Sequence, residues 1–313
     1  MSRTIWLASY PKSGNTWLRM LLANLSAEET SVDINDLPAR GGIASARAPF
    51  DHLTLIDSGL LTHDEIDCLR PRVYEALARG AEDDEYDTRQ EMPAVRFVKV
   101  HDAYTLTPNG EPLLAGRGGA DRAIVIVRDP RDVAPSLANH NRTDIEQSIT
   151  LMNDLQGGQS RSPGRLHEQF RQLLPSWSGH VASWLDQTDL PVHLIRYEDM
   201  LADTLGTFRR ALEFAGLTAS DDKVRRALAF AAFTELRRQE EERGFREAPR
   251  RPGGPFFRRG EAGAWRDELT ADQIARIEAA HAPMMRRLGY QLAGDVSPAL
   301  TASARQWEMA SGE

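Results

Sequence analysis

The sequence predicts an α/β fold in which a parallel sheet is flanked by helices, and three observations favour this class. Short, continuously apolar runs are typical of parallel strands that are buried on both faces. Helical patterns separate these runs, and polar residues suited to binding anions follow them directly, where open α/β sheets bind ligands. The runs expected to form strands are Thr4–Ser9, Val95–Val100, Ala123–Val127 and Val192–Arg196.

Helices are predicted between and after the strands from apolar spacing and from signals at their ends. Two helices open with a capping box, in which a threonine and a Glu or Gln three residues later satisfy each other's backbone donors. A third has an aspartate before its start and a glycine at its end. The residues that give these signals are Thr62, Glu65, Asp203, Gly216, Thr270 and Gln273. The predicted helices cover Trp17–Leu25, 62–79, Asp132–His140, 203–216 and 270–288.

The amino-acid composition excludes several classes of function. Hydrophobic residues make up 41% of the 313 residues and charged residues 27%, as in ordinary globular proteins, and the net charge of −8 disfavours a general nucleic-acid binder. Cys68 is the only cysteine, so an internal disulfide and a cysteine metal site are excluded. With no signal-peptide core and no run approaching about 20 apolar residues, we expect a cytoplasmic protein.

One domain is expected over residues 1–293, followed by a tail of uncertain order over 294–313. Within the domain, three segments lack a clear period and are predicted to be loops. Residues 31–60 and 244–263 are rich in Gly and Pro, whereas residues 82–93 are acidic.

A candidate anion-binding turn follows the first predicted strand. Residues 10–17 read YPKSGNTW and lead from the strand into a helix, whose free N–H groups and dipole attract phosphate. Gly14 permits close backbone approach, and Lys12 adds a full charge. The turn differs from the Walker A pattern, because its lysine precedes the glycine. We therefore predict a phosphate-binding turn of another type; the alternative is an ordinary turn with a surface lysine.

Two further candidate residues stand at the ends of predicted strands. His101 follows the second strand, and the near-neutral pKa of histidine suits a general base. Arg128 follows the third strand, and its guanidinium matches phosphate geometry; Ser136, eight residues later, adds a hydroxyl. The alternatives are a structural histidine, and a surface arginine beside a helix-capping Asp129.

Five segments together resemble the sulfotransferase family that uses 3′-phosphoadenosine 5′-phosphosulfate (PAPS). They resemble, in chain order, its 5′-phosphosulfate loop, the segment with its catalytic histidine, its 3′-phosphate motif, its Tyr-Glu-Asp block and its late Arg-Lys-Gly loop. These segments are 10–17, 99–101, 127–136, 196–200 and 257–265. The resemblance extends from residue 5 to about residue 290 and implies a P-loop-like sulfotransferase fold, with the sulfotransferase domain over 1–293.

The resemblance implies an enzyme that transfers a sulfo group from PAPS to a hydroxyl or amine of a small acceptor and releases 3′-phosphoadenosine 5′-phosphate (PAP). His101 would be the base, and Lys12 and Lys99 would neutralise charge on the transferred group and on the departing bridge oxygen. The donor-binding residues that it implies are Lys12, Ser13, Gly14, Asn15, Thr16, Trp17, Arg128, Ser136, Tyr197, Phe233, Arg258, Arg259 and Gly260.

The chain departs from the family pattern at three positions and leaves other functions open. Ala231 stands where an adenine-contacting threonine is common, Ala264 replaces a common aspartate and Asn15 a common threonine. We place no adenine hydrogen bond on Ala231. The alternatives are a P-loop nucleotide kinase or NTPase, and a non-catalytic nucleotide-binding protein. We expect no metal, nucleic-acid or membrane partner; the acceptor and a homodimer stay open.

Overall fold

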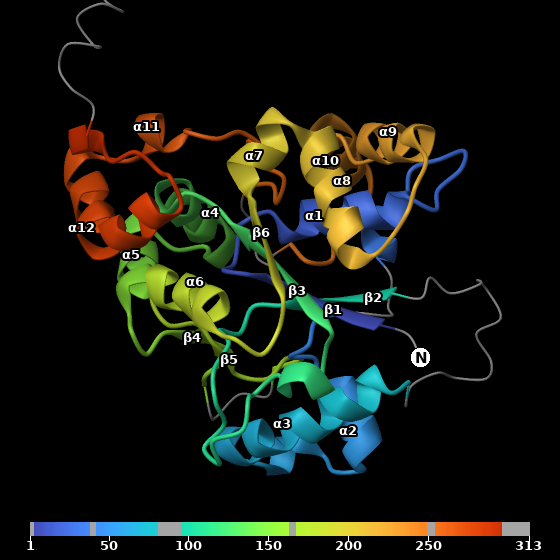
Figure 1. Ribbon diagram of the computed structural model, residues 1–313. Helices are drawn as coiled ribbons and strands as arrows, with labels where there is room; N and C mark the ends of the chain where they lie inside the picture. Colours follow the sequence, from blue (N-terminus) through green and yellow to red (C-terminus); the bar gives the residue numbers. More distant parts are fainter. Residues whose placement is uncertain (1–2, 38–41, 81–94, 163–166, 249–253, 296–313) are drawn as a thin grey trace, which may run out of the picture.

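The computed structural model describes residues 3–37, 42–80, 95–162, 167–248 and 254–295. Its centre is a four-stranded sheet in the order β2–β1–β3–β6, in which all neighbouring strands are parallel (Figure 1). The strands are β1 (Arg3–Ser9), β2 (Val95–Val100), β3 (Arg122–Val127) and β6 (Val192–Arg196). The predicted fold class is confirmed, and each predicted strand agrees with the structure to within one residue at either end.

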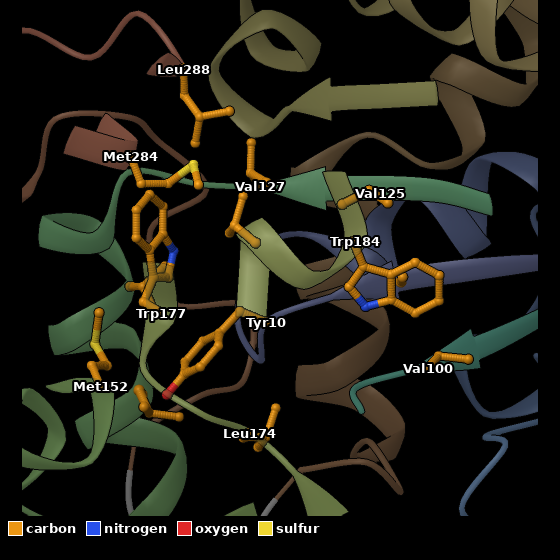
Figure 2. Close-up of a cluster of buried hydrophobic side chains, with 14 of the residues drawn as sticks. Tyr10, Val100, Val125, Val127, Met152, Leu174, Trp177, Trp184, Met284 and Leu288 are labelled. Atoms are coloured by element: carbon orange, nitrogen blue, oxygen red, sulfur yellow. The ribbon is translucent and has the colours of Figure 1, made fainter. Parts of the chain in front are cut away.

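Helices cover both faces of the sheet (Figure 1). The side chains of β1 alternate between the two faces. Ile5 and Leu7 pack into a core with helices α1, α8, α9 and α10, whereas Trp6 and Ala8 pack on the other face with α4, α5, α6 and α12. Figure 2 shows the second of these cores, where Trp177 and Trp184 lie near the β3 valines. The helices named here are α1 (Asn15–Asn24), α4 (Pro130–Asn141), α5 (Ile145–Asn153), α6 (Trp177–Asp186), α8 (Thr204–Ala215), α9 (Asp221–Phe230), α10 (Phe233–Arg243) and α12 (Ala271–Arg287).

The end signals read from the sequence are confirmed. Both capping boxes are formed, at Thr62 and at Thr270, and Asp203 and Gly216 cap the two ends of α8. Two helices begin two residues earlier than predicted. The helix α1 starts after Gly14, whose carbonyl accepts from the Trp17 N–H, and α4 starts at Pro130, a residue whose fixed φ suits the first helical position.

The prediction of a loop over 31–60 is wrong in part. Residues Arg47–Thr54 form helix α2, which packs with α3 (His63–Ala78) around a small core of its own that includes Phe50. Pro49 suggested a loop but lies in the first turn of α2, where its missing N–H costs nothing. In the predicted loop 244–263, residues 244–248 and 254–263 form no helix or strand, as expected.

The remaining segments have short elements or lie outside the described residues. The predicted loop 82–93 and residues 296–313 of the predicted tail lie outside the described ranges. Within those ranges, no helix is both long enough and apolar enough to cross a membrane. The short elements are α7 (Tyr197–Ala202), α11 (Trp265–Glu268), β4 (Gly158–Gln159), β5 (Gln172–Leu173), and 3-10 turns at Ile34–Asp36, Ser58–Leu60, Gly116–Gly118 and Ala293–Asp295.

Buried histidines in the core predict that acid destabilises the protein. His281 is 1% exposed, lies against the Trp177 ring and pairs with the Ser178 hydroxyl at 2.9 Å. Burial lowers the pKa of His281 to about 4, so the unfolded chain takes up a proton that the folded chain resists between pH 6.5 and pH 4. Stability from this group is therefore complete above about pH 6.5 and is lost as the pH falls.

His281→Gln is expected to remove about 2 kcal/mol of the fall in unfolding free energy between pH 7 and pH 4.5. Urea unfolding at the two pH values measures this difference. His52→Gln, which changes an exposed histidine, serves as the control and should retain the full fall. An equal fall in both variants would contradict the assignment.

Candidate active site

Each strand of the parallel sheet ends next to a residue of the predicted site. His101, Arg128 and Tyr197 directly follow β2, β3 and β6, and Lys12 lies three residues after β1. The strand ends are level, because the register pairs Ala8 with Val100, Ser9 with Ile126 and Val127 with Arg196. Residues far apart in the chain therefore meet at one edge of the sheet.

At this edge the structure has a cavity of about 670 Å³. Every predicted site residue except Ser13 lines it. The lining set from the prediction is Lys12, Gly14, Asn15, Thr16, Trp17, Lys99, His101, Arg128, Ser136, Tyr197, Phe233, Arg258, Arg259 and Gly260. Ser13 is fully buried, and its hydroxyl has no hydrogen-bond partner among the residues that the structure describes.

The turn after β1 has the backbone geometry of an anion site. Gly14 is the N-cap of α1 with φ 103° and has no side chain to cap the first turn, so the N–H groups of Asn15 and Thr16 have no hydrogen-bond partner among the described residues. Tyr197 lies directly against Gly14, since a Cβ placed there would be 2.6 Å from the tyrosine ring. The Asn15 amide donates to the Leu7 carbonyl at 2.8 Å and thereby fastens the turn to β1.

Lys12 is held in an unusual environment for a lysine. Its Nζ lies 3.6 Å from the centre of the Phe256 ring. Burial, followed by repulsion from Lys99 and Arg128, lowers the pKa of Lys12 to about 7. A small change in its surroundings therefore decides whether this lysine is charged near neutral pH.

The surroundings of His101 fix which ring nitrogen can accept a proton. Its Nδ1 lies 2.8 Å from the Ser9 carbonyl oxygen, which only accepts, so Nδ1 carries the hydrogen and Nε2 has the free lone pair. Burial and the nearby Lys99 lower the pKa of His101 well below its usual value. The ring is therefore neutral at pH 7, as a general base must be before it acts.

Lys99 contacts an acidic residue that the sequence analysis missed. Its Nζ lies 3.0 Å from one carboxylate oxygen of Glu247, and Arg19 binds the other oxygen at 2.7 Å. Burial raises the pKa of Glu247, but the two cations outweigh it and hold the pKa at about 2. The carboxylate therefore stays charged and holds Lys99 and Arg19 together in the cavity.

Three arginines also line the cavity, namely Arg128, Arg258 and Arg259. Arg128 lies 4.4 Å from the Tyr197 ring centre and donates to the Glu261 carbonyl at 3.0 Å. Arg258 and Arg259 each donate to the same oxygen of Glu268 at 2.9 Å. The alternative interpretation, a surface arginine beside a helix-capping Asp129, is only partly right. Asp129 caps α4, but Arg128 lines the cavity.

Aromatic side chains also line the cavity. The Trp17 indole N–H donates to the Ala231 carbonyl at 3.0 Å, and its ring meets the Tyr197 ring edge to face at 5.8 Å. Gly260, with φ +69°, packs against Phe233, whose ring a Cβ at this position would approach to 2.3 Å.

In the described part of the chain, no group of three or more His, Cys, Asp or Glu side chains is arranged to hold a metal ion.

Fold and site together define an open α/β protein with a cavity at the carboxyl edge of its sheet, lined by lysines, arginines and aromatic side chains. The sulfotransferase domain family matches residues 2–289, nearly the whole chain. The chain belongs to this family, and the predicted resemblance is confirmed.

Two curated relatives are both distant in sequence. Luciferin sulfotransferase of Photinus pyralis is 24% identical over 239 residues, which are 74% of this chain and 56% of that protein. Cytosolic sulfotransferase 17 of Arabidopsis thaliana is 23% identical over 284 residues, which are 87% of this chain and 71% of that protein. This chain thus spans little more than half of the length of luciferin sulfotransferase.

Solved structures share the fold. A mouse sulfotransferase complexed with PAP has a TM-score of 0.55 and 20% identity, and the match covers 91% of this chain and 85% of that one. Retinol dehydratase in a complex with retinol and PAP has a TM-score of 0.56 and 19% identity, covering 91% and 82%. The predicted sulfotransferase fold is confirmed.

Proposed function

We propose that the protein is a sulfotransferase that moves a sulfo group from PAPS to a hydroxyl or amine of a small acceptor. The observation that carries this proposal is the meeting of Lys12, His101, Arg128 and Tyr197 in one cavity, each at the end of its own strand. A nucleotide with phosphates at O3′ and O5′ of one ribose needs two anion sites that the ribose can bridge, and a place for adenine beside them. Family membership, and the PAP bound to two proteins of the same fold, support this choice of donor.

For the donor, we propose that the turn after β1 holds the 5′-phosphosulfate. The free N–H groups of α1 and the Lys12 ammonium face this end. Arg128 and Ser136, joined by Arg258 and Arg259, are proposed to bind the 3′-phosphate. The aromatic residues that line the same cavity are proposed to contact adenine, and they are Trp17, Tyr197 and Phe233.

The proposed reaction is a direct in-line transfer. The acceptor oxygen or nitrogen forms a bond to sulfur while the bond from sulfur to the bridging oxygen of the 5′-phosphate breaks. The acceptor proton passes to Nε2 of His101, and PAP leaves with the bridging oxygen. Lys12 and Lys99 stabilise the charge on that oxygen and on the sulfo group, so catalysis rests on positioning and electrostatics.

The acceptor is proposed to enter beside Lys99. There the segment around Ile43 pairs with β2 at Lys99, and the cavity is lined by Gln159, Gln169 and Glu247. A small-molecule acceptor agrees with the retinol in the related complex, which is a property of that protein. We also propose the cytoplasm as the compartment, as the name of the Arabidopsis relative says of that protein.

Gly14→Ala is expected to weaken PAP binding at least about tenfold, because a Cβ would collide with Tyr197 and force the turn to move. Isothermal titration calorimetry measures the affinity. Gly110→Ala is the matched control: Gly110 also has positive φ, +81°, but a Cβ there meets nothing within 4 Å. Equal PAP affinity in both variants would contradict the proposed place of the donor.

The function itself is tested by ligand binding followed by product analysis. We expect PAP to stabilise the protein thermally far more than ATP or AMP does, and PAPS to yield sulfated products with a panel of phenols, alcohols and amines, detected by mass spectrometry. Magnesium-dependent hydrolysis of ATP would instead favour a kinase or NTPase. PAP binding without transfer to any acceptor would favour a non-catalytic nucleotide-binding protein.

A further inference from the structure

Two carboxylates from different helices bracket the segment that carries the paired arginines, residues 256–265, which we call the arginine segment. Glu240 of α10 accepts from the backbone N–H of Phe256 at 2.6 Å and of Phe257 at 2.9 Å, one with each oxygen. At the other end, Asp132 of α4 accepts from the N–H of Gly263 at 2.7 Å and of Trp265 at 2.9 Å.

The arginine segment has little other backbone support at the end that Glu240 holds. Residues 256–262 belong to no helix or strand, and within the described ranges their N–H groups donate no hydrogen bond to another backbone carbonyl. The two amide contacts with Glu240 are charge-assisted, which makes them stronger than bonds between neutral groups. Glu240 therefore governs where this end of the segment lies.

The residues at the end of the arginine segment that Glu240 binds form part of the cavity wall. The Phe256 ring, on the first residue that Glu240 binds, lies 3.6 Å from Nζ of Lys12. Arg258 and Arg259 follow directly and line the same cavity. Gly260, next in line, packs against Phe233, the first residue of α10, so both ends of this helix touch the segment.

Glu240 also contributes charge. It raises the pKa of Lys12, in opposition to burial and to the repulsion by Lys99 and Arg128. The carboxylate thus supports the charged form of the lysine under the Phe256 ring, in addition to holding the backbone that carries this ring.

We propose that Glu240 is a positioning residue for donor binding, which holds the start of the arginine segment so that Phe256, Arg258 and Arg259 face the nucleotide, while Asp132 holds its far end. The inference rests on the proposed function, because the donor is taken to be PAPS. Glu240 itself need not touch the donor; it acts through the backbone of the residues that do.

The test compares Glu240→Gln with Glu241→Gln. A glutamine at 240 keeps one acceptor oxygen but turns an NH₂ group towards the second backbone N–H, so one contact becomes a repulsion. Glu241 is the next residue on the same helix, is exposed and pairs with Arg237, so its change is matched in chemistry but does not affect the segment. Both full-length variants and the wild type are titrated with PAP and with AMP, and donor KM and kcat are measured.

We expect Glu240→Gln to weaken PAP binding and to raise the donor KM at least about tenfold, with a smaller effect on kcat. Glu241→Gln should match the wild type throughout. A purely structural role of Glu240 would lower the melting temperature and the amount of active enzyme without this selective rise in KM.

The outcomes separate the two proposals. A wild type that shows no preference for PAP over AMP overturns the proposed function. A wild type that prefers PAP, together with a Glu240→Gln variant that binds PAP equally well, overturns the positioning role alone. If Glu240→Gln fails to fold, Glu240→Asp is used, which keeps the charge but is too short to reach both N–H groups; wild-type PAP affinity in that variant also overturns the role.

Discussion

Replacing His101 by alanine is expected to lower kcat at least about hundredfold while PAP affinity stays within about twofold of wild type. The expectation follows from the ring geometry: Nδ1 is committed to the Ser9 carbonyl, so Nε2 is the atom that can remove the acceptor proton. PAP has no sulfo group and needs no base, so its binding should be unaffected. Single-turnover kinetics and calorimetry measure the two quantities.

The control for this prediction is His52→Ala, which removes an exposed histidine. Turnover in the control should equal that of the wild type. An unchanged rate in His101→Ala would remove this residue from the mechanism, and a parallel loss of PAP affinity would mean that it holds the nucleotide instead.

The second large effect is a loss of activity at alkaline pH that depends on Lys12. Its pKa of about 7 lies far below the ordinary value of 10.5, so the ammonium is charged below pH 7 and neutral above it. The pKa of His101 is lowered well below 6.5, so the base is already neutral over this range. The kcat/KM for PAPS should therefore fall by about tenfold per pH unit above pH 7.

Lys12→Met should abolish this pH dependence and lower kcat/KM at pH 6.5 by at least about a hundredfold, because a charge on the departing oxygen is no longer stabilised. Rates at donor concentrations below KM, taken from pH 6 to pH 9, give the profile. Lys223→Met, on the exposed face of α9, should keep the wild-type profile. A wild-type profile that stays level to pH 9 would show that Lys12 remains charged in the free enzyme.

The strand ends could be predicted from the sequence because two independent signals coincide there. Continuous apolar runs mark buried parallel strands, and the residues that follow them must meet at one edge of the sheet. This rule was sufficient to bring Lys12, His101 and Arg128 together. Phe233 came only from the family resemblance, since nothing in its local sequence distinguishes it from a core residue. Tyr197 directly follows the fourth predicted strand, but its role near adenine also came from the resemblance.

The acidic residues of the site could not be predicted from the sequence. Glu240 and Glu247 lie in or beside the charged stretch that ends α10, and by sequence they look like any solvated helix face. Their partners are backbone N–H groups of residues 256 and 257 in one case and Lys99 in the other, all fixed by the tertiary fold. Helix α2 was missed for a related reason, because its stability comes from packing of Phe50 and not from helix signals at its ends.

The level strand ends have a consequence for how members of such a family can diverge. His101, Arg128 and Tyr197 directly follow strands of the four-stranded sheet, whereas Ile43, Gln159 and Gln169, on the side proposed for the acceptor, lie outside that sheet. Mutation can rebuild those segments without shifting the sheet, so new acceptor preferences can arise, or be engineered by transplanting loops, while the cofactor requirement is inherited unchanged.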